Sequence, residues 1–393
     1  MAAAICFFCG SPQSVQGKDK YLIYLSLSYS GNAWQSEAAN IVKALAATPP
    51  YDKIVELREV ISGTDVQAQI SAYESMIAAH ADGVISFPIS ATALNRTVKR
   101  GSQQGVLFFM YDATVTEPSA YNVSYITAGF GENTAQYLVN CLKGKGKIFL
   151  SRGVPGNSVD QRHTDGAMSI FKKYPGIQVV QEYYSYWDDR TTQQETAKAL
   201  AAHPDVDGIW AQAGEYGAIQ ALLAARPDKL IPVTGENSNG FRLALANEDL
   251  RKRGLQGVSS GSPPATSGYA FKLMMEMLTG KRKLQTHNIQ YPLPWVTADE
   301  VRTIKGDRLE NGSNAFAEGT VPSSFVTESF SQAFLPEISL VSALEGKPTP
   351  GATIQPLPAD VTPAPDEPNI NCQNCKPPAD HYKLTKVTAE VKP

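Results

Sequence analysis

The chain has 393 residues, 42% of them hydrophobic and 19% charged, and its formal net charge is −3. This length exceeds what one ordinary hydrophobic core requires, so it predicts two domains and an extension. The small negative charge argues against nucleic acid or an anionic membrane surface as a partner. Because no run of about 18 apolar residues occurs, the sequence offers no candidate membrane-spanning helix.

From residue 20 to about residue 280, short apolar runs typical of buried parallel strands alternate with amphipathic stretches typical of helices. Asp65 is placed to cap the helix that follows the second strand. The alternation predicts an α/β fold with two doubly wound parallel-sheet lobes. The expected strands are residues 20–28, 53–61, 82–87, 106–111, 147–151, 177–184, 208–212 and 230–235.

Both ends of the chain differ from this pattern. Residues 1–17 are expected to be a signal remnant or a disordered N-terminus. Residues 325–344 keep enough apolar side chains for one helix against a lobe, and the proline-rich residues 336–393 predict an extension over the surface or a partly disordered tail. The paired cysteines suit disulfides in an oxidising compartment, although two C-x-x-C pairs could also bind zinc. These cysteines are Cys6, Cys9, Cys372 and Cys375.

Polar and aromatic side chains gather just after the predicted strands. In open α/β sheets, ligands bind beyond the carboxyl ends of the strands. Carboxylates and amides pair with the hydroxyls of a neutral polyhydroxy ligand, and aromatic faces cover its C–H surface. A polar residue after a strand is also commonly a turn or a cap, so the joint occurrence carries the hypothesis. The stretches are residues 30–34, 88–90, 111–112, 153–163, 187–189, 212–215, 236–237 and 259–260.

Two of these stretches carry a resemblance to a known family. SGNAWQ at residues 30–35 is similar to a first loop in which an asparagine precedes aromatics, and GVPGNSVDQRHTDG at residues 153–166 matches a glycine-punctuated loop without a gap. With these motifs, residues 18–297 resemble the ribose-type periplasmic binding proteins, which serve ABC importers of sugars. The resemblance implies a periplasmic protein, acting as a monomer, that captures a sugar, polyol or related polar solute and delivers it to a permease.

The resemblance also implies individual roles. Asn32 falls at a hydrogen-bonding position and Trp34 at a stacking position, while His163, with Arg162 adjacent, falls where the family has a ligand arginine. Ala113 replaces the arginine that normally follows the aspartate at Asp112, which argues against ribose itself. With the residues at the predicted strand ends, the expected ligand-binding set is Asn32, Trp34, Gln35, Ser90, Asp112, Arg162, His163, Trp187, Gln212, Glu236, Asn237 and Ser260.

By the same resemblance, three crossings near Thr127, Ser260 and Asn288 form a hinge between the lobes. The first lobe is then residues 18–128 with 261–287, and the second is residues 129–260 with 288–335. The ligand lies in the cleft, and its binding closes the lobes without chemistry. No catalytic residue, metal or cofactor is expected.

Other classes of protein remain as alternatives. GVSSG at residues 257–261 matches the G-x-S-x-G motif of hydrolases, which requires a helix directly after the serine, whereas Pro263 and Pro264 follow here. Three strand-end carboxylates, Asp112, Glu215 and Glu236, could serve glycoside hydrolysis. A sugar-responsive repressor would need a basic DNA-binding segment before the first strand, where about twenty residues with two lysines stand. A membrane-tethered receptor of the same fold is the other alternative.

Overall fold

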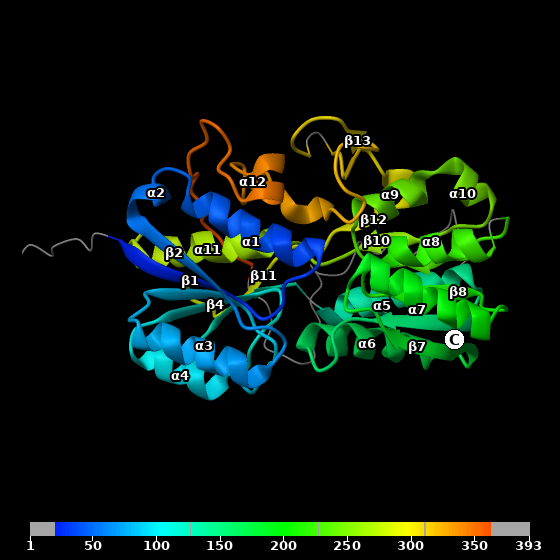
Figure 1. The fold of residues 1–393 in the computed structure, drawn as a ribbon, viewed down its shortest axis with the longest axis horizontal. Helices are drawn as coiled ribbons and strands as arrows, with labels where there is room; N and C mark the ends of the chain where they lie inside the picture. Colours follow the sequence, from blue (N-terminus) through cyan, green and yellow to red (C-terminus); the bar gives the residue numbers. More distant parts are fainter. Residues whose placement is uncertain (1–19, 126, 227, 310–311, 363–393) are drawn as a thin grey trace, which may run out of the picture.

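The computed structural model describes residues 20–362 except 126, 227 and 310–311, and these residues form two lobes side by side (Figure 1). The first lobe contains a parallel sheet with the strand order β11-β5-β4-β3-β1-β2. Its strands are Tyr21–Leu27 (β1), Val55–Ile61 (β2), Gly83–Phe87 (β3), Leu107–Tyr111 (β4), Tyr121–Ser124 (β5) and Asn288–Gln290 (β11).

Helices cover both faces of this sheet. The short helix α2 (Tyr51–Ile54) follows α1, and α1 and α11 pack on one face while α3 and α4 pack on the other (Figure 1). The apolar side chains of α1 face the sheet, as their helical spacing predicts. Asp65 accepts a hydrogen bond from the Ala68 amide at 2.7 Å, which confirms the predicted cap. These helices are Ala33–Ala46 (α1), Val66–Ala78 (α3), Asn95–Gln103 (α4) and Ala265–Leu278 (α11).

The second lobe repeats the plan around a parallel sheet with the order β7-β6-β8-β9. Its strands are Lys145–Arg152 (β6), Gly176–Tyr184 (β7), Gly208–Ala211 (β8) and Val233–Thr234 (β9). Separate apolar clusters lie on its two faces, which confirms the predicted doubly wound class. The helices are Thr127–Cys141 (α5), Ser158–Phe171 (α6), Asp189–Ala202 (α7), Glu215–Ala225 (α8), Asn239–Ala246 (α9) and Glu248–Lys252 (α10).

Three of the connections between the lobes lie near the expected positions, and a fourth follows later in the chain. The three lie between β5 and α5, between β10 (Val258–Ser260) and α11, and between β11 and β12 (Trp295–Thr297). The expected division placed residues from Asn288 onward in the second lobe, but β11 pairs with β5 in the first sheet. The Asn122 amide donates to Asn288 Oδ1 at 2.9 Å and holds this pairing, so the third connection begins after β11.

The chain after β12 stays on the second lobe through β14, where Asn239 bonds to Phe316, and then returns to the first lobe. The helix expected within residues 325–344 is confined to α12 (Leu340–Glu345), because the backbone before it bonds to other elements, as Phe325 does through its carbonyl. Before α12 come η1 (Ala298–Glu300), β13 (Thr303–Ile304), β14 (Ala315–Phe316) and η2 (Thr327–Ser329). α12 lies beside α1, where Asn40 donates to the Ala343 and Leu344 carbonyls at 3.0 Å (Figure 1).

Residues 346–362 continue over the first lobe, as expected for a surface extension. Ile354 donates its amide to the Pro49 carbonyl at 2.8 Å, and Gln290 donates to Thr362 at 2.8 Å. The four paired cysteines and residues 1–17 lie outside the described residues. None of the helices described in this structure combines the length and apolar character needed to cross a membrane.

A buried ion pair fixes the returning chain to α11. Lys272 Nζ lies 2.7 Å from Glu337 Oε1, and both side chains are 1% exposed. We expect Lys272→Met to lower the free energy of unfolding by about 3–5 kcal/mol in urea titrations, because Glu337 keeps a buried charge without its partner. The double variant Lys272→Met/Glu337→Met should recover most of this loss. Equal losses in the single and double variants would contradict this account.

Candidate functional site

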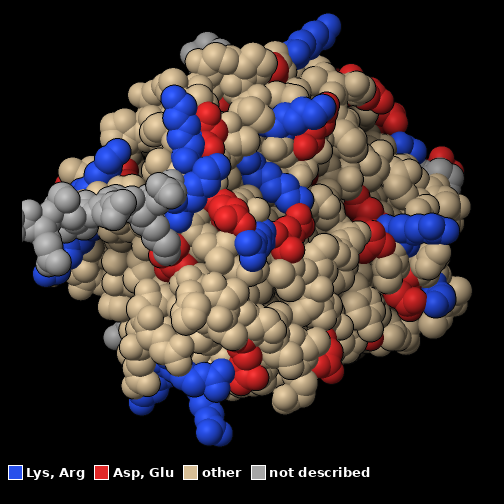
Figure 2. Space-filling view, turned by 60° about the vertical axis from the view of Figure 1, so that its left-hand side comes forward, with Lys and Arg blue, Asp and Glu red and all other residues tan. Residues whose placement is uncertain are grey.

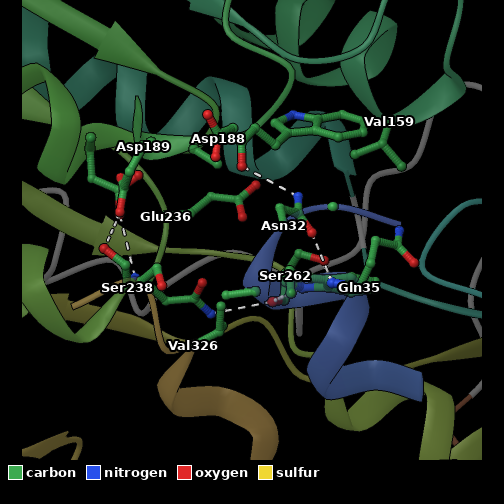
Figure 3. Close-up of a pocket in the computed structure, with 18 of the residues that line it drawn as sticks. Asn32, Gln35, Val159, Asp188, Asp189, Glu236, Ser238, Ser262 and Val326 are labelled. Atoms are coloured by element: carbon green, nitrogen blue, oxygen red, sulfur yellow. Dashed lines mark hydrogen bonds between the residues drawn. The ribbon is translucent and has the colours of Figure 1, made fainter. Parts of the chain in front are cut away.

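A cavity of about 880 Å³, including the part open to solvent, lies between the lobes at the carboxyl ends of both sheets (Figure 3). The loops after β1 and β4 and the end of β3 supply one wall, and the segments after β6, β7, β8 and β9 supply the other. This is where open α/β sheets bind ligands. The lining residues are Gly31, Asn32, Ala33, Trp34, Gln35, Phe87, Asp112, Val159, Trp187, Asp188, Asp189, Ala213, Gly214, Glu215, Glu236, Asn237, Ser238, Ser262, Ser324 and Val326.

The start of α1 shapes the first-lobe wall. Asn32 caps the helix, because its Oδ1 accepts a hydrogen bond from the Gln35 amide at 2.9 Å. Trp34 lies in the first turn, stacked on Tyr111 with the ring centroids 6.2 Å apart and the planes 20° apart. Its indole nitrogen donates to the Ser262 carbonyl at 2.8 Å. A cap and a hydrogen bond thus fix the positions of an amide and an indole at the cavity.

Ser262 connects both lobes at the second connection. Its carbonyl accepts from Trp34 of the first lobe at 2.8 Å and from the Asn237 amide of the second lobe at 3.3 Å. Its hydroxyl donates to Asp112 Oδ1. Asp112 has a φ of 62°, a left-handed conformation that is costly for a residue with a side chain. Burial raises the pKa of Asp112 to about 7, against the opposing effects of the Ser262 hydroxyl and Arg162.

Trp187 faces this wall from the second lobe. Its φ is 56°, and its indole nitrogen donates to Gln212 Oε1 at 3.1 Å. A Cβ at Gly153 would lie 2.0 Å from the indole ring, so only glycine leaves space for Trp187 at this position. Gln212 is itself fixed, because its amide nitrogen donates to Asp160 Oδ1 at 2.9 Å. The indole is therefore positioned from both sides.

Carboxyl groups with raised pKa values line the second-lobe wall. Burial, followed by the negative charge of Asp189, raises the pKa of Glu215 to about 7. Glu236 points into the cavity (Figure 3), and burial, followed by the charges of Glu215 and Asp112, holds its pKa well above the usual range. The pKa of Asp189 is raised to about 6 by burial, against the opposing Gly217 amide. Ionised carboxylates are thus disfavoured here until something replaces water as their partner.

Three buried oxygen atoms at this cavity have no hydrogen-bond partner within the described protein. They are Gln35 Oε1, Glu215 Oε2 and Asn237 Oδ1. Buried polar atoms are nearly always paired, so these acceptors call for a donor from outside the chain. A ligand that carries several hydroxyl groups can supply such donors.

The lobes close over the cavity through direct hydrogen bonds. Asn32 donates through its amide to the Trp187 carbonyl at 3.3 Å. Tyr29 donates through its hydroxyl to the Tyr186 carbonyl at 3.1 Å. Arg162 of the second lobe donates to the Thr114 hydroxyl of the first at 2.9 Å. The structure is therefore a closed arrangement of the two lobes.

Seven of the twelve residues expected to bind ligand line this cavity: Asn32, Trp34, Gln35, Asp112, Trp187, Glu236 and Asn237. The other five, Ser90, Arg162, His163, Gln212 and Ser260, are not among the lining residues. Ser90 accepts hydrogen bonds from the amides of the turn that follows it, and Arg162 and Gln212 make the contacts described above. Polar residues after strands are thus divided between the cavity and the support of its walls.

His163 and Ser260 lie behind the cavity, near the hinge. His163 Nε2 lies 2.8 Å from the Tyr125 hydroxyl, and burial, followed by Arg162, lowers the pKa of its imidazole to about 3. The imidazole is therefore neutral near pH 7, unlike the arginine that the family has at this position. Ser260 donates to the Pro294 carbonyl at 2.7 Å and joins two of the connections. Ser262, two residues later, has the contact with the cavity that was expected of Ser260.

Sequence reasoning missed further lining residues. Asp188, Asp189 and Glu215 stand in the strand-end stretches and could have been chosen from that signal, while Val159 and Ser238 lie in the first turn of a helix or at its cap. Ser324 and Val326 come from the returning C-terminal chain, where no sequence pattern indicated a site. No cluster of metal-ligating side chains occurs in the described parts of the chain.

The G-x-S-x-G motif does not form a nucleophile elbow. Ser259 lies in β10 and is fully buried, and its hydroxyl donates to the Glu236 carbonyl at 2.7 Å. The next helix, α11, begins only at Ala265, whereas an elbow requires a helix directly after the serine. Ser259 is therefore a structural residue beneath the cavity.

A family model described as the periplasmic binding protein domain matches residues 23–282, and the chain belongs to this family. The resemblance inferred from the sequence is thereby confirmed. The xylitol-binding protein of Mycolicibacterium smegmatis is 26% identical over 253 residues, which cover 63% of this chain and 70% of that protein. The D-apiose import binding protein of Paraburkholderia graminis is 24% identical over 262 residues, 65% of this chain and 82% of that protein.

A solved ABC transporter solute binding protein from Thermobispora bispora has the same fold. It is 20% identical, with a TM-score of 0.65, and the alignment covers 87% of this chain and 99% of that one. The shared fold therefore extends beyond the part of the chain that the family model matches.

Asp112 should make stability fall as the pH rises. Because burial raises its pKa to about 7, the folded protein keeps a proton that the unfolded chain loses near pH 4. We expect Asp112→Asn to reduce the loss of unfolding free energy between about pH 4 and pH 7 by up to about 4 kcal/mol, measured by urea titration at each pH.

Ser262→Ala is the matched comparison for this prediction. It removes the hydroxyl that favours the ionised form of Asp112, so the loss of stability should extend to higher pH. Identical pH profiles for wild type and both variants would show that Asp112 does not titrate as described.

Proposed function

We propose that this protein captures a neutral sugar, polyol or related polar solute between its lobes and delivers it to the permease of an ABC importer. The observation that carries the proposal is the set of unpartnered acceptors at Gln35, Glu215 and Asn237, in a cavity that two tryptophans also line. Hydroxyl groups would supply the missing donors, and the rings of Trp34 and Trp187 would cover the C–H face of the solute.

The charge of the cavity supports a solute without negative charge. Five carboxyl groups are among its lining residues and no lysine or arginine is. A sugar acid or sugar phosphate would meet these carboxyl groups without a cation to balance it. The names of the relatives from M. smegmatis and P. graminis, which refer to xylitol and D-apiose, agree with a small neutral polyhydroxy compound.

Binding closes the lobes, and we propose that the closed form is the one the permease recognises. A ligand that contacts both walls stabilises the closed state by its differential affinity for that state. Lysine, arginine, aspartate and glutamate side chains are interspersed on the face shown in Figure 2, so this face offers no basic patch for nucleic acid. We place the protein in the periplasm as a monomer without enzymatic activity or a cofactor.

A thermal-shift screen against neutral pentitols, pentoses, hexitols and hexoses tests the proposal. A ligand at a hundredfold excess over its dissociation constant stabilises the protein by about 2.7 kcal/mol, so a clear shift is expected with at least one of these compounds. Sugar acids should give none. Chromatography must then recover the compound unchanged after hours of incubation. Hydrolysis of a glycoside or sugar ester would instead assign the site to a hydrolase.

The two cavity tryptophans should each contribute to affinity. We expect Trp34→Ala and Trp187→Ala to weaken binding of the screened solute by on the order of 1–3 kcal/mol, because each removes an aromatic surface from the cavity. Isothermal titration calorimetry measures the change. Tyr186→Ala is the matched control, because this aromatic neighbour of Trp187 is 45% exposed and does not line the cavity. Unchanged affinity in both tryptophan variants would move the site elsewhere.

A further inference from the structure

The chain crosses between the lobes a fourth time, through residues 323–329, here called the strap. On the second lobe, the strap runs along the start of α9. Gly240 donates its amide to the Ser323 carbonyl at 2.8 Å, and Asn239 donates to the Phe325 carbonyl at 2.7 Å. Ser238 forms an antiparallel bridge with Val326. The backbone of the strap is thus paired with the loop that carries the lining residues Asn237 and Ser238.

Arg242 strengthens this attachment. Its guanidinium is fully buried, donates to the Thr327 hydroxyl at 2.5 Å, and forms an ion pair with Glu328. It also donates through Nε to the Ser259 hydroxyl at 2.9 Å, which ties the strap to β10. Buried charge-assisted bonds of this kind are among the stronger polar contacts in proteins.

On the first lobe, the strap is held by Glu37 of α1. This carboxyl group is 3% exposed and accepts the Val326 amide at 3.0 and 3.2 Å and the Ser329 hydroxyl at 2.5 Å. The Val326 side chain packs into the first-lobe core. Val326 therefore contacts both lobes at once, and the lobes cannot separate fully without breaking one of these two sets of contacts.

The strap also belongs to the wall of the cavity. Ser324 and Val326 line it beside Asn237, Ser238 and Ser262, and Figure 3 shows Val326 below Ser262 and Ser238. A branched apolar side chain at this position limits how far a ligand can extend toward the strap. Val326 thus closes one side of the cavity with its side chain and bonds to Glu37 of the first lobe through its backbone amide.

We propose that the strap sets the size of the ligand accepted, with Val326 as a specificity-determining residue, and that its bonds to Glu37 restrain the opening of the lobes. The first half of this proposal rests on the proposed function. The second half concerns the protein without ligand and stands independently of what the protein binds.

Small-angle X-ray scattering of the ligand-free protein tests whether the bonds between Glu37 and the strap, here called the tether, restrain the opening of the lobes. Glu37→Ala removes the acceptor for the Val326 amide and should increase the radius of gyration, whereas Glu37→Gln keeps an acceptor and should restore the wild-type value. Glu276→Ala is the matched control, because this buried carboxyl group accepts the Leu357 amide within the first lobe only. A wild-type radius of gyration in folded Glu37→Ala, or the same increase in Glu276→Ala, would overturn the tether.

Isothermal titration calorimetry with xylitol and D-glucitol tests whether Val326 limits the size of the ligand. Val326→Ala should improve the affinity for the six-carbon polyol relative to the five-carbon one by about tenfold, because it enlarges the cavity at the strap. Val326→Phe should weaken the binding of both. Val321→Ala, in the same chain segment but outside the cavity lining, should leave the ratio unchanged. An unchanged ratio in Val326→Ala, or no binding of either polyol, would overturn this half while leaving the scattering result to decide the tether.

Discussion

The central constraint in this structure is the burial of oxygen atoms that the protein does not supply with donors. Gln35, Glu215 and Asn237 contribute acceptors from both lobes. Such atoms cost free energy when they are buried without a partner, and a carboxyl group responds by holding its proton. The raised pKa values of Asp112, Glu215 and Glu236 follow from the same burial. A ligand rich in donors relieves this cost only when both walls meet around it.

The connections between the lobes link the binding of a ligand to the relative position of the two lobes. Ser262 bonds to residues of both lobes, so movement of the second connection repositions Trp34 and Asn237 together. The left-handed backbone at Asp112 and Trp187 stores strain at the two sides of the cavity. The strap adds a fourth link that shares residues with the cavity wall. In this account the strap, a segment of the C-terminal chain, affects both the size of the ligand and the closure of the lobes.

The sequence predicted the fold well and the site in part. Alternation of apolar runs and helical patterns is a local signal, and it located both sheets and the cap at Asp65. The position after a strand predicted Asn32 and Glu236 at the cavity, but it could not separate lining residues from supporting ones. Ser90 caps a turn and Gln212 supports Trp187, because these roles depend on the direction of the side chain. Val326 reaches the cavity through tertiary packing, which leaves no pattern in the sequence.

The crystal structure of the protein with the solute that gives the largest thermal shift would test the central claim most directly. The account predicts electron density between the lobes, with hydroxyl groups donating to Gln35, Glu215 and Asn237, the rings of Trp34 and Trp187 against the carbon skeleton, and the chemical structure of the solute intact. A solute bound outside this cavity, or one that leaves those three oxygen atoms without a donor, would contradict it.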